Sequence, residues 1–408
     1  MLFQLRLLAY RFAKMFMKPV VKLVSQPRPV LFVGPDSTSQ LCRMMTAFGF
    51  ERVLIVTDAI LVTLGLVDPI RKALENSGID VSVFDGIQPD PTYAVIESGH
   101  EAVLAHRSDA VLAIGGGSSI DAAKIIAAMA TTDKPPRKLL GFFKLSKPTL
   151  PLFVIPTTAG TGSEVTVVAV VSDPETHVKT AVVDPKLVPT AAALDPRMMK
   201  GMPRPITAAT GMDALTHAVE AYINRWPVAE TAFHSVSAVR MIFANLPRAY
   251  ADGEDLEARE AMALASFYAG LAFTKAYVGY VHAFSHKLGG HYGTPHGLGN
   301  AITMPYVLDF VKESAWAQAR LAELAVAIGA GKPSEPKATL AGRFIERVRE
   351  LSRKVGIPEK LDALKAADIP AIAREAMIEA HRDYPVPRNM SLAEAERLLS
   401  RMLPQAAR

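Results

Sequence analysis

The sequence predicts an α/β domain with a largely parallel sheet, followed by a domain built from helices alone. The chain has 408 residues, more than a single hydrophobic core usually contains, so we expect two domains. Residues 29–205 alternate short apolar runs with helical stretches, which is the pattern of a parallel sheet covered by helices. Residues 206–408 contain long amphipathic helical patterns and few strand signals. Residues 1–28 form a separate basic extension.

Apolar runs bounded by turn residues predict strands, and longer periodic stretches predict helices. The predicted strands are residues 29–33, 52–57, 80–84, 110–114 and 152–156, and the predicted helices are residues 66–77, 92–106, 229–245, 256–273 and 335–355. Residues 131–150, rich in Pro and Lys, predict a surface excursion. Alternating residues on either side of Asp173–Pro174 predict a β-rich insertion at residues 166–195.

Composition and charge exclude several classes of protein. Cys42 is the only cysteine, so the chain has no internal disulfide and no zinc site built on thiolates, and we expect a reducing, cytoplasmic location. Six of the 45 basic residues and none of the 40 acidic residues lie in residues 1–28, so the net charge of +5 becomes −1 for the rest of the chain. The body of the protein therefore lacks the basic footprint of nucleic-acid binding.

The basic extension has the pattern of an amphipathic helix. Its basic residues Arg11, Lys14, Lys18 and Lys22 follow one another at intervals of three or four and line one helical face. These charges interrupt the apolar run too often for a transmembrane span or a secretory signal. One interpretation is peripheral binding of residues 1–25 to an anionic membrane surface. The alternatives are a helix packed on the protein's own surface or on another subunit and, third, a mitochondrial presequence.

Two short segments of the second domain combine carboxylate and imidazole side chains at helical spacing. Asp213 and His217 are four residues apart, as are His282 and His286, so each pair projects from one face of a helix. The candidate metal ligands are Asp213, His217, His282 and His296. One carboxylate with three neutral imidazoles suits Fe(II) or Zn(II). A single such pair is more often a surface or capping pair, but two segments favour a metal site.

A glycine-rich turn in the first domain indicates a phosphate site. The strand DAVLAI leads into GGGSSIDAAK at residues 115–124, where glycines allow close approach and the helix start offers N–H groups to a pyrophosphate. This motif differs from the G-x-G-x-x-G fingerprint, and a plain strand-to-helix turn is the alternative. Asp58, which ends the strand ERVLIVTD, suits ribose hydroxyls and repels a 2′-phosphate, which favours NAD over NADP. The segment PTTAGTGSE at residues 156–164 supplies hydroxyls and glycines at the same end of the sheet.

Four motifs, GGGSSIDAAK, PTTAGTGSE, GMDALTHAVEAY and HAFSHKLGGHYGTPHG, resemble in this order the iron-containing (group III) alcohol dehydrogenase family, including its lactaldehyde reductase-like members. The resemblance covers residues 29–400. It implies a dehydroquinate synthase-like architecture, with an NAD-binding α/β domain at residues 29–205 and an all-α metal-binding domain at residues 206–408. It also implies a cleft between the domains and a homodimer.

The resemblance further implies roles for single residues. It assigns the metal to the four candidate ligands already named, and it gives His286 a proton-transfer role beside the substrate. The residues implied in nucleotide binding are Asp58, Gly116, Gly117, Ser118, Thr157, Thr158 and Lys179. Among these, the two glycines and Ser118 contact the pyrophosphate, Asp58 selects NAD, and Lys179 lies close to the nicotinamide ribose.

These parts predict a metal-dependent, NAD-linked alcohol dehydrogenase that moves hydride reversibly between NAD and a primary aliphatic alcohol or its aldehyde. The metal would polarise the substrate oxygen, and His286 would relay a proton or, alternatively, only hydrogen-bond the cofactor or a water. The other activities considered are a hydroxyacid–oxoacid transhydrogenase, an NAD- and metal-dependent lyase of the dehydroquinate synthase type, and a metal-binding module without activity. The lyase needs a cluster of basic residues, and residues 266–300 offer only Lys275 and Lys287.

Some positions depart from the family pattern or have two interpretations. Asp90 stands where many members have asparagine, and DYPVPRN at residues 383–389 lacks the frequent Asn-Pro-Arg pattern. His291 is expected to have a supporting or structural role instead of binding the metal. The aromatic residues Phe273, Tyr277 and Tyr280 precede His282, and they either shape an apolar substrate pocket or belong to the core.

Overall fold

The computed structural model describes Leu7, Tyr10 and residues 27–132, 134–173, 179–226 and 228–404. It contains two compact units, which are described separately. The sheet unit comprises Gln26–Met202 and Gly253–Gly270, and the helical unit contains Pro203–Asp252 and Leu271–Arg408. The predicted amphipathic helix at residues 1–28 falls almost wholly outside the described residues, so it stays a prediction.

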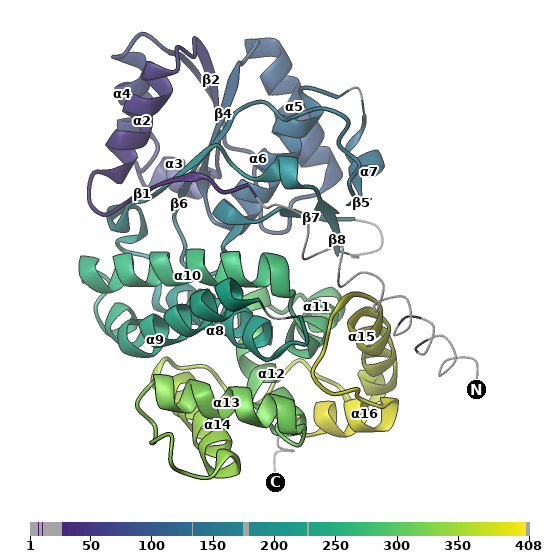
Figure 1. Cartoon of the computed structure of the whole chain (residues 1–408). Coiled ribbons are helices and arrows are strands. Elements are labelled where there is room, and N and C mark those ends of the chain that lie inside the picture. The colour runs from purple at the N-terminus through teal and green to yellow at the C-terminus, as the bar shows by residue number, and fades with distance from the viewer. Residues whose placement is uncertain are drawn as a thin grey trace. The chain divides into compact units, whose positions relative to one another are not determined.

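The described part of the sheet unit contains a six-stranded, wholly parallel sheet in the order β1-β9-β6-β4-β2-β3 (Figure 1). The strands are β1 Val30–Val33, β2 Arg52–Val56, β3 Asp80–Phe84, β4 Ala110–Gly115, β6 Leu152–Pro156 and β9 Ala191–Leu194. The predicted parallel sheet is confirmed, and each of its five predicted strands is present to within one residue. The sequence missed β9, which lies inside the predicted β-rich insertion, because its AAAL has none of the β-branched residues that mark a strand.

Helices pack on both faces of this sheet. Helices α2 Ser37–Ala47 and α4 Asp68–Glu75 share one core with the sheet, and α5 Tyr93–His106 and α6 Gly117–Met129 share the other. In β4, Val111 and Ala113 belong to the α5 and α6 core, whereas Leu112 and Ile114 belong to the α2 and α4 core. Successive strand side chains point to opposite faces, so both faces of β4 are buried and its sequence is an unbroken apolar run.

The predicted β-rich insertion is an antiparallel pair beside a third short strand. The pair consists of β7 Val168–Ser172 and β8 Lys179–Val183, and β5 Gly141–Phe142 pairs with β8. The Pro- and Lys-rich segment includes α7 Pro136–Leu139 and is largely exposed, as the sequence predicted. It is nevertheless anchored, because Leu139 and Leu145 are buried in the α5 and α6 core.

The described residues of the helical unit contain helices and turns but no strand, as predicted. Its helices are α8 Arg204–Ile223, α9 Ala229–Ala251, α11 Tyr280–Tyr292, α12 His296–Val311, α13 Ala315–Ala327, α14 Lys337–Lys354, α15 Ile369–Asp383 and α16 Leu392–Ser400. Helix α10 Leu256–Ala276 is divided between the two units after Gly270. Helix α8 is buried along most of its length, which its many alanines and small residues permit.

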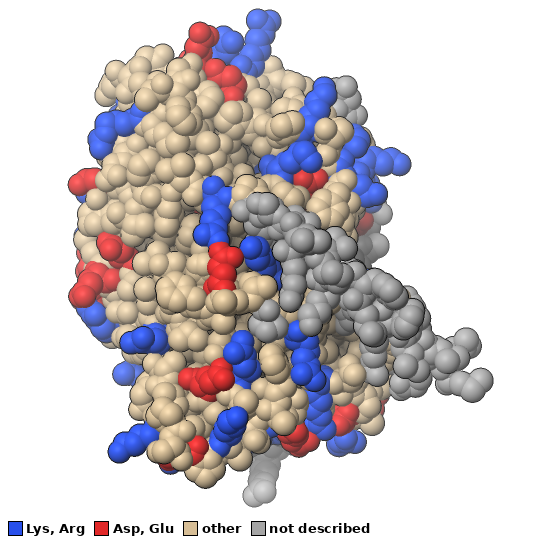
Figure 2. All heavy atoms as spheres, viewed as in Figure 1, with Lys and Arg blue, Asp and Glu red and all other residues tan. Residues whose placement is uncertain are grey.

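The described surface shows neither a single-sign charge field on the face in view nor a membrane-spanning helix. In Figure 2, Lys and Arg side chains are interspersed with Asp and Glu, as the near-neutral charge of the body predicts. No single described helix is long and apolar enough to cross a membrane, although α10 and α11, bent by 103°, meet the same criteria as a pair.

A buried lysine in the sheet unit joins α6 to the segment that leads into β7. Lys124 is 0% exposed, and its Nζ donates to the carbonyl oxygens of Thr166 at 2.9 Å and Val168 at 2.7 Å. On the same helix, Asp121 accepts from the Val170 N–H at 2.9 Å and from the Ser163 hydroxyl. Burial lowers the pKa of Lys124 to about 8. The carbonyl oxygens that accept from Lys124 lie inside the core, and leaving these oxygens without a donor would be costly.

Replacing Lys124 by methionine keeps most of the side-chain volume but removes the charge and the donors. We expect the free energy of unfolding to fall by about 3–5 kcal/mol, because the carbonyl oxygens of Thr166 and Val168 lose their donor and the nearby carboxylates of Asp121 and Glu164 lose a neighbouring positive charge. Urea denaturation followed by circular dichroism measures this change. Lys72→Met on the exposed face of α4 is the control, with an expected change within about 0.5 kcal/mol. Equal effects of the two substitutions would contradict the role given to Lys124.

Candidate metal centre and nucleotide loop

The structure brings the four predicted metal ligands together. Asp213 and His217 come from α8, His282 from α11, and His296 is the first residue of α12. Each offers one ligand atom, and these atoms all lie within 4.8 Å of one another. Asp213, His217 and His282 are buried, whereas 31% of the His296 side chain is exposed, so the cluster is accessible from one side.

Small residues allow the three helices to approach closely enough to form this cluster. A Cβ atom on Gly297 would lie 2.4 Å from the Ala209 carbonyl oxygen of α8, and one on Gly299 would lie 2.5 Å from Ser285 Oγ of α11. Neither position tolerates a larger residue without movement of the backbone or of a buried side chain. The glycines that follow His296 in the sequence therefore set the distance between the ligand-bearing helices.

The amide of Asn300 shows that the lone pairs of three ligands converge. Asn300 Nδ2 donates to Asp213 Oδ1 at 2.7 Å and lies 3.2 Å from Nε2 of both His282 and His296. A donor placed within reach of three acceptors occupies the kind of position that a cation prefers. The donor set and its convergence fit a divalent transition metal.

Protonation in the cluster also suits metal binding. Burial lowers the pKa of His282 well below its ordinary value, so the imidazole is neutral, which is the form that binds metals. Burial raises the pKa of Asp213. A bound divalent cation would oppose that effect and favour the ionised carboxylate.

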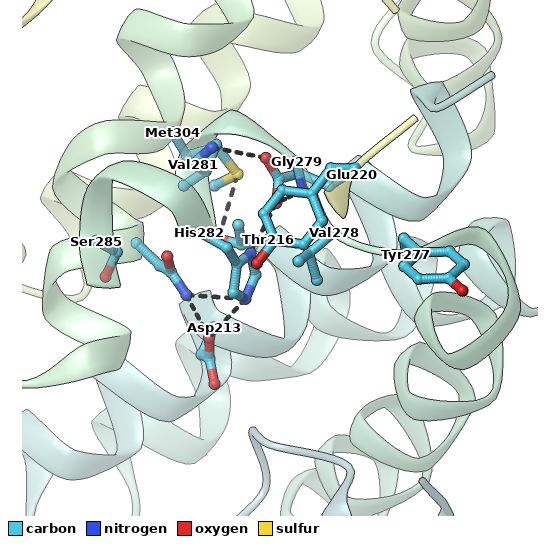
Figure 3. A network of polar contacts seen from close by, with 12 residues as sticks. Asp213, Thr216, Glu220, Tyr277, Val278, Gly279, Val281, His282, Ser285 and Met304 are labelled. Atoms are coloured by element: carbon cyan, nitrogen blue, oxygen red, sulfur yellow. Dashed lines mark hydrogen bonds and ion pairs between the residues drawn. The ribbon is translucent and has the colours of Figure 1, made fainter. Parts of the chain in front are cut away.

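Glu220 is a site residue that the sequence interpretation missed. Figure 3 shows the His282 ring between Glu220 and Asp213. Glu220 accepts from His282 Nδ1 at 2.7 Å and from the N–H groups of Gly279 at 2.8 Å and Val281 at 2.7 Å. The carboxylate therefore fixes the proton on Nδ1 and leaves Nε2 as the ligand atom. The signal was present, because residues 213, 217 and 220 share one face of an apolar helix.

The remaining aromatic and histidine positions separate into different environments. His286 lies beside the cluster, with its ring centroid 5.3 Å from that of His296, whereas His291 pairs with Glu375 at 3.3 Å on an exposed part of the helix. Phe273 stacks on the His217 ring at 4.2 Å between centroids. Tyr280 is 1% exposed and accepts a bond from the Met390 N–H, which places it in the core.

In the sheet unit, two predicted nucleotide-binding loops pack directly on each other. Gly115 ends β4 and pairs with Pro156 at the end of β6, so both loops leave the same edge of the sheet. A Cβ atom on Gly117 would lie 2.6 Å from Thr161, and one on Gly116 would lie 3.3 Å from Thr158. The N–H groups at the start of α6 and the hydroxyls of the second loop are therefore neighbours.

Two further residues that were predicted to contact the nucleotide, Asp58 and Lys179, form hydrogen bonds or ion pairs within the protein. Asp58 Oδ1 accepts from the N–H groups of Ile60 and Leu61, both at 3.0 Å, and so caps the short helix α3 Ala59–Thr63. Lys179 forms a 2.5 Å ion pair with Asp90, whose N–H donates to Ser118 Oγ at 3.3 Å. The structure thus places Lys179 and Asp90 next to the glycine-rich loop, although they are far apart in sequence.

Comparison with known proteins gives matches along almost the whole chain. The family described as "Iron-containing alcohol dehydrogenase" matches residues 28–196, and "Fe-containing alcohol dehydrogenase family, C-terminal" matches residues 207–403. The chain is 39% identical over 349 residues to alcohol dehydrogenase 4 of Schizosaccharomyces pombe, covering 85% of this chain and 81% of that protein.

Solved structures show the same fold. A crystal structure of 1,3-propanediol oxidoreductase superposes with a TM-score of 0.89 at 35% identity, covering 93% of this chain and 100% of the other. The sulfoacetaldehyde reductase of Bifidobacterium kashiwanohense, solved in complex with NAD+, superposes with a TM-score of 0.83 at 28% identity, covering 93% and 98%.

Replacing Glu220 by glutamine tests whether this carboxylate orients His282 for metal binding. We expect Zn(II) affinity to fall by about 10–100-fold, because glutamine does not accept the three N–H donors equally well. Competition against a chromophoric chelator measures the affinity. Glu323→Gln is the control, since Glu323 contacts Tyr222 and Arg320, which are not among the candidate ligands. Unchanged affinity in Glu220→Gln would remove Glu220 from the site.

Proposed function

Because the chain belongs to the iron-containing alcohol dehydrogenase family, we propose that it is an NAD-dependent dehydrogenase of primary aliphatic alcohols and their aldehydes. Membership in the family makes the chain an oxidoreductase that acts on an alcohol or aldehyde. The convergence of one carboxylate and three imidazoles in the helical unit carries the proposal. The glycine-rich loop at the start of α6 supports it with a place for a dinucleotide.

The proposed metal ligands are Asp213, His217, His282 and His296, holding Fe(II), or Zn(II) because the same donors accept both. Such an ion, when bound, lowers the pKa of an alcohol and stabilises the alkoxide. Glu220 holds His282 in the tautomer that presents Nε2. His286, which is partly exposed beside this cluster, accepts the proton that leaves the alcohol.

The proposed nucleotide site lies at the edge of the sheet where β4 and β6 end. The N–H groups at Gly116, Gly117 and Ser118 suit a pyrophosphate, because a helix start carries unpaired donors and a positive dipole end. In the neighbouring loop Thr157 and Thr158 supply hydroxyls. Asp58 is proposed to bind the ribose hydroxyls and disfavour NADP, and Lys179 to approach the nicotinamide ribose.

Initial rates with alcohols from two to sixteen carbons, NAD or NADP, and protein loaded with Fe(II) or Zn(II) test the activity. We expect turnover with NAD, and we expect His282→Ala to lose both turnover and metal binding because one of four ligands is removed. His291→Ala is a matched control on the same helix, outside the cluster, and should retain both. Turnover by His282→Ala equal to that of the unaltered enzyme would exclude the proposed site.

We further propose that the enzyme is a homodimer in the cytoplasm and that residues 1–25 contact the membrane surface. The homodimer is inferred from the family resemblance. Size-exclusion chromatography with light scattering measures the mass of the protein in solution and so tests it. The membrane contact rests on the basic face of the extension, since each basic residue near an anionic surface contributes about 1 kcal/mol.

Deleting residues 2–25 tests the membrane contact. We expect the full chain to sediment with vesicles that contain phosphatidylserine and not with phosphatidylcholine alone, and we expect the deletion to abolish this difference. A variant with Arg11, Lys14, Lys18 and Lys22 replaced by glutamine should behave like the deletion, because it removes the charge and keeps the length. Unchanged sedimentation of both variants would contradict the proposal.

A further inference from the structure

A second carboxylate, which is partly buried, holds the histidine beside the candidate metal cluster. Glu379 on α15 accepts from His286 Nδ1 at 2.6 Å and from the Tyr384 hydroxyl at 2.7 Å, both through Oε1. Its other oxygen, Oε2, pairs with Lys287 Nζ at 2.8 Å. The side chain of Glu379 is 13% exposed, whereas that of His286 is 29% exposed. The carboxylate therefore lies behind the histidine, and the histidine is the more accessible partner.

We propose that Glu379 is a positioning residue that keeps His286 in one tautomer, with the proton on Nδ1 and the lone pair on Nε2 for the substrate proton. This inference rests on the proposed proton-transfer role of His286. An ionised carboxylate only accepts hydrogen bonds, so a neutral His286 bonded to it carries its proton on Nδ1. Among the described residues, His286 Nε2 makes no hydrogen bond.

The environment of Glu379 keeps it ionised. Lys287 Nζ, 2.8 Å from Oε2, places a positive charge beside Glu379 and favours the ionised form of this carboxyl. Tyr384 adds a hydroxyl donor to the oxygen that already binds His286. With both oxygens engaged by donors from α11 and from the end of α15, the carboxylate has little freedom to rotate. The orientation of the imidazole ring is fixed accordingly.

The same two helices contain a second Glu–His pair that serves as an internal comparison. Glu375 lies four residues before Glu379 on α15 and pairs with His291 of α11. That contact is 3.3 Å long, and the Glu375 side chain is 47% exposed. This exposed pair joins α11 to α15 outside the candidate cluster. The Glu379 pair differs by its shorter contact, the lower exposure of its carboxylate, its three donors and its position beside the cluster.

The test compares Glu379→Ala with Glu375→Ala, using the full chain loaded with Zn(II) and labelled with ¹⁵N-histidine. Long-range ¹H–¹⁵N spectra report the tautomer of His286, which is assigned by its absence in His286→Asn. We expect Glu379→Ala to lose the single Nδ1–H tautomer and Glu375→Ala to keep it. Because the spectrum needs no turnover, a failure of the proposed activity is distinguishable from a failure of this inference.

Steady-state kinetics provide a second, independent measurement. For Glu379→Ala we expect kcat to fall by about 10–100-fold, with KM changed less than about threefold and Zn(II) affinity unchanged. The reason is that Glu379 orients His286 for proton transfer and contacts none of the candidate metal ligands. Glu379→Gln keeps the shape and one acceptor oxygen, so it should recover part of kcat, and it replaces the alanine variant if that variant does not fold. Retention of the tautomer, or kcat equal to that of Glu375→Ala, would overturn the proposal.

Discussion

The hydrogen bond between Glu220 and His282, 2.7 Å long and inaccessible to solvent, is the contact on which the candidate metal centre depends. Glu220 also accepts from the N–H groups of Gly279 and Val281, which belong to the start of α11. One carboxylate thus satisfies backbone donors at a helix N-terminus, where negative charge is favourable, and orients the candidate ligand His282 in the same first turn. If it were absent, the start of α11 would be left with buried unpaired N–H groups, and His282 would have no fixed tautomer.

Close packing extends this constraint to the rest of the cluster. His296 begins α12, and the glycines that follow it let α12 approach α8 and α11 at distances that a Cβ atom would prevent. The three helices that carry the candidate ligands therefore meet around a small volume, which the alanines of α8 and the glycines at the start of α12 make possible. The chemistry and the packing of the helical unit are consequently inseparable, because a change in helix spacing moves the ligand atoms.

Buried and partly buried carboxylates recur as the groups that orient other polar residues in this protein. Glu220 orients the candidate metal ligand His282, Glu379 orients His286, and in the sheet unit Asp121 holds the segment that follows the second candidate nucleotide loop. Each lies on a helix and accepts from more than one donor. A buried acceptor with several donors is held more rigidly than an exposed ion pair, which is screened and free to move. Rigidity of this kind is what hydride and proton transfer require of their surroundings.

Local patterns in the sequence determined the parallel sheet, the helical second half and the four candidate ligands. Apolar runs of five residues mark buried strands, and the spacing of four between Asp213 and His217 marks one face of a helix. Both patterns span only a few residues, so they can be recognised in the sequence. Only the tertiary structure decided which residues hydrogen-bond or pair with the candidate site residues. Glu379 is 93 residues from His286, and Lys179 is 89 residues from Asp90. No local periodicity records such pairs, because they exist only once distant elements have packed; likewise AAAL becomes the strand β9 only because β1 and β6 supply its hydrogen bonds.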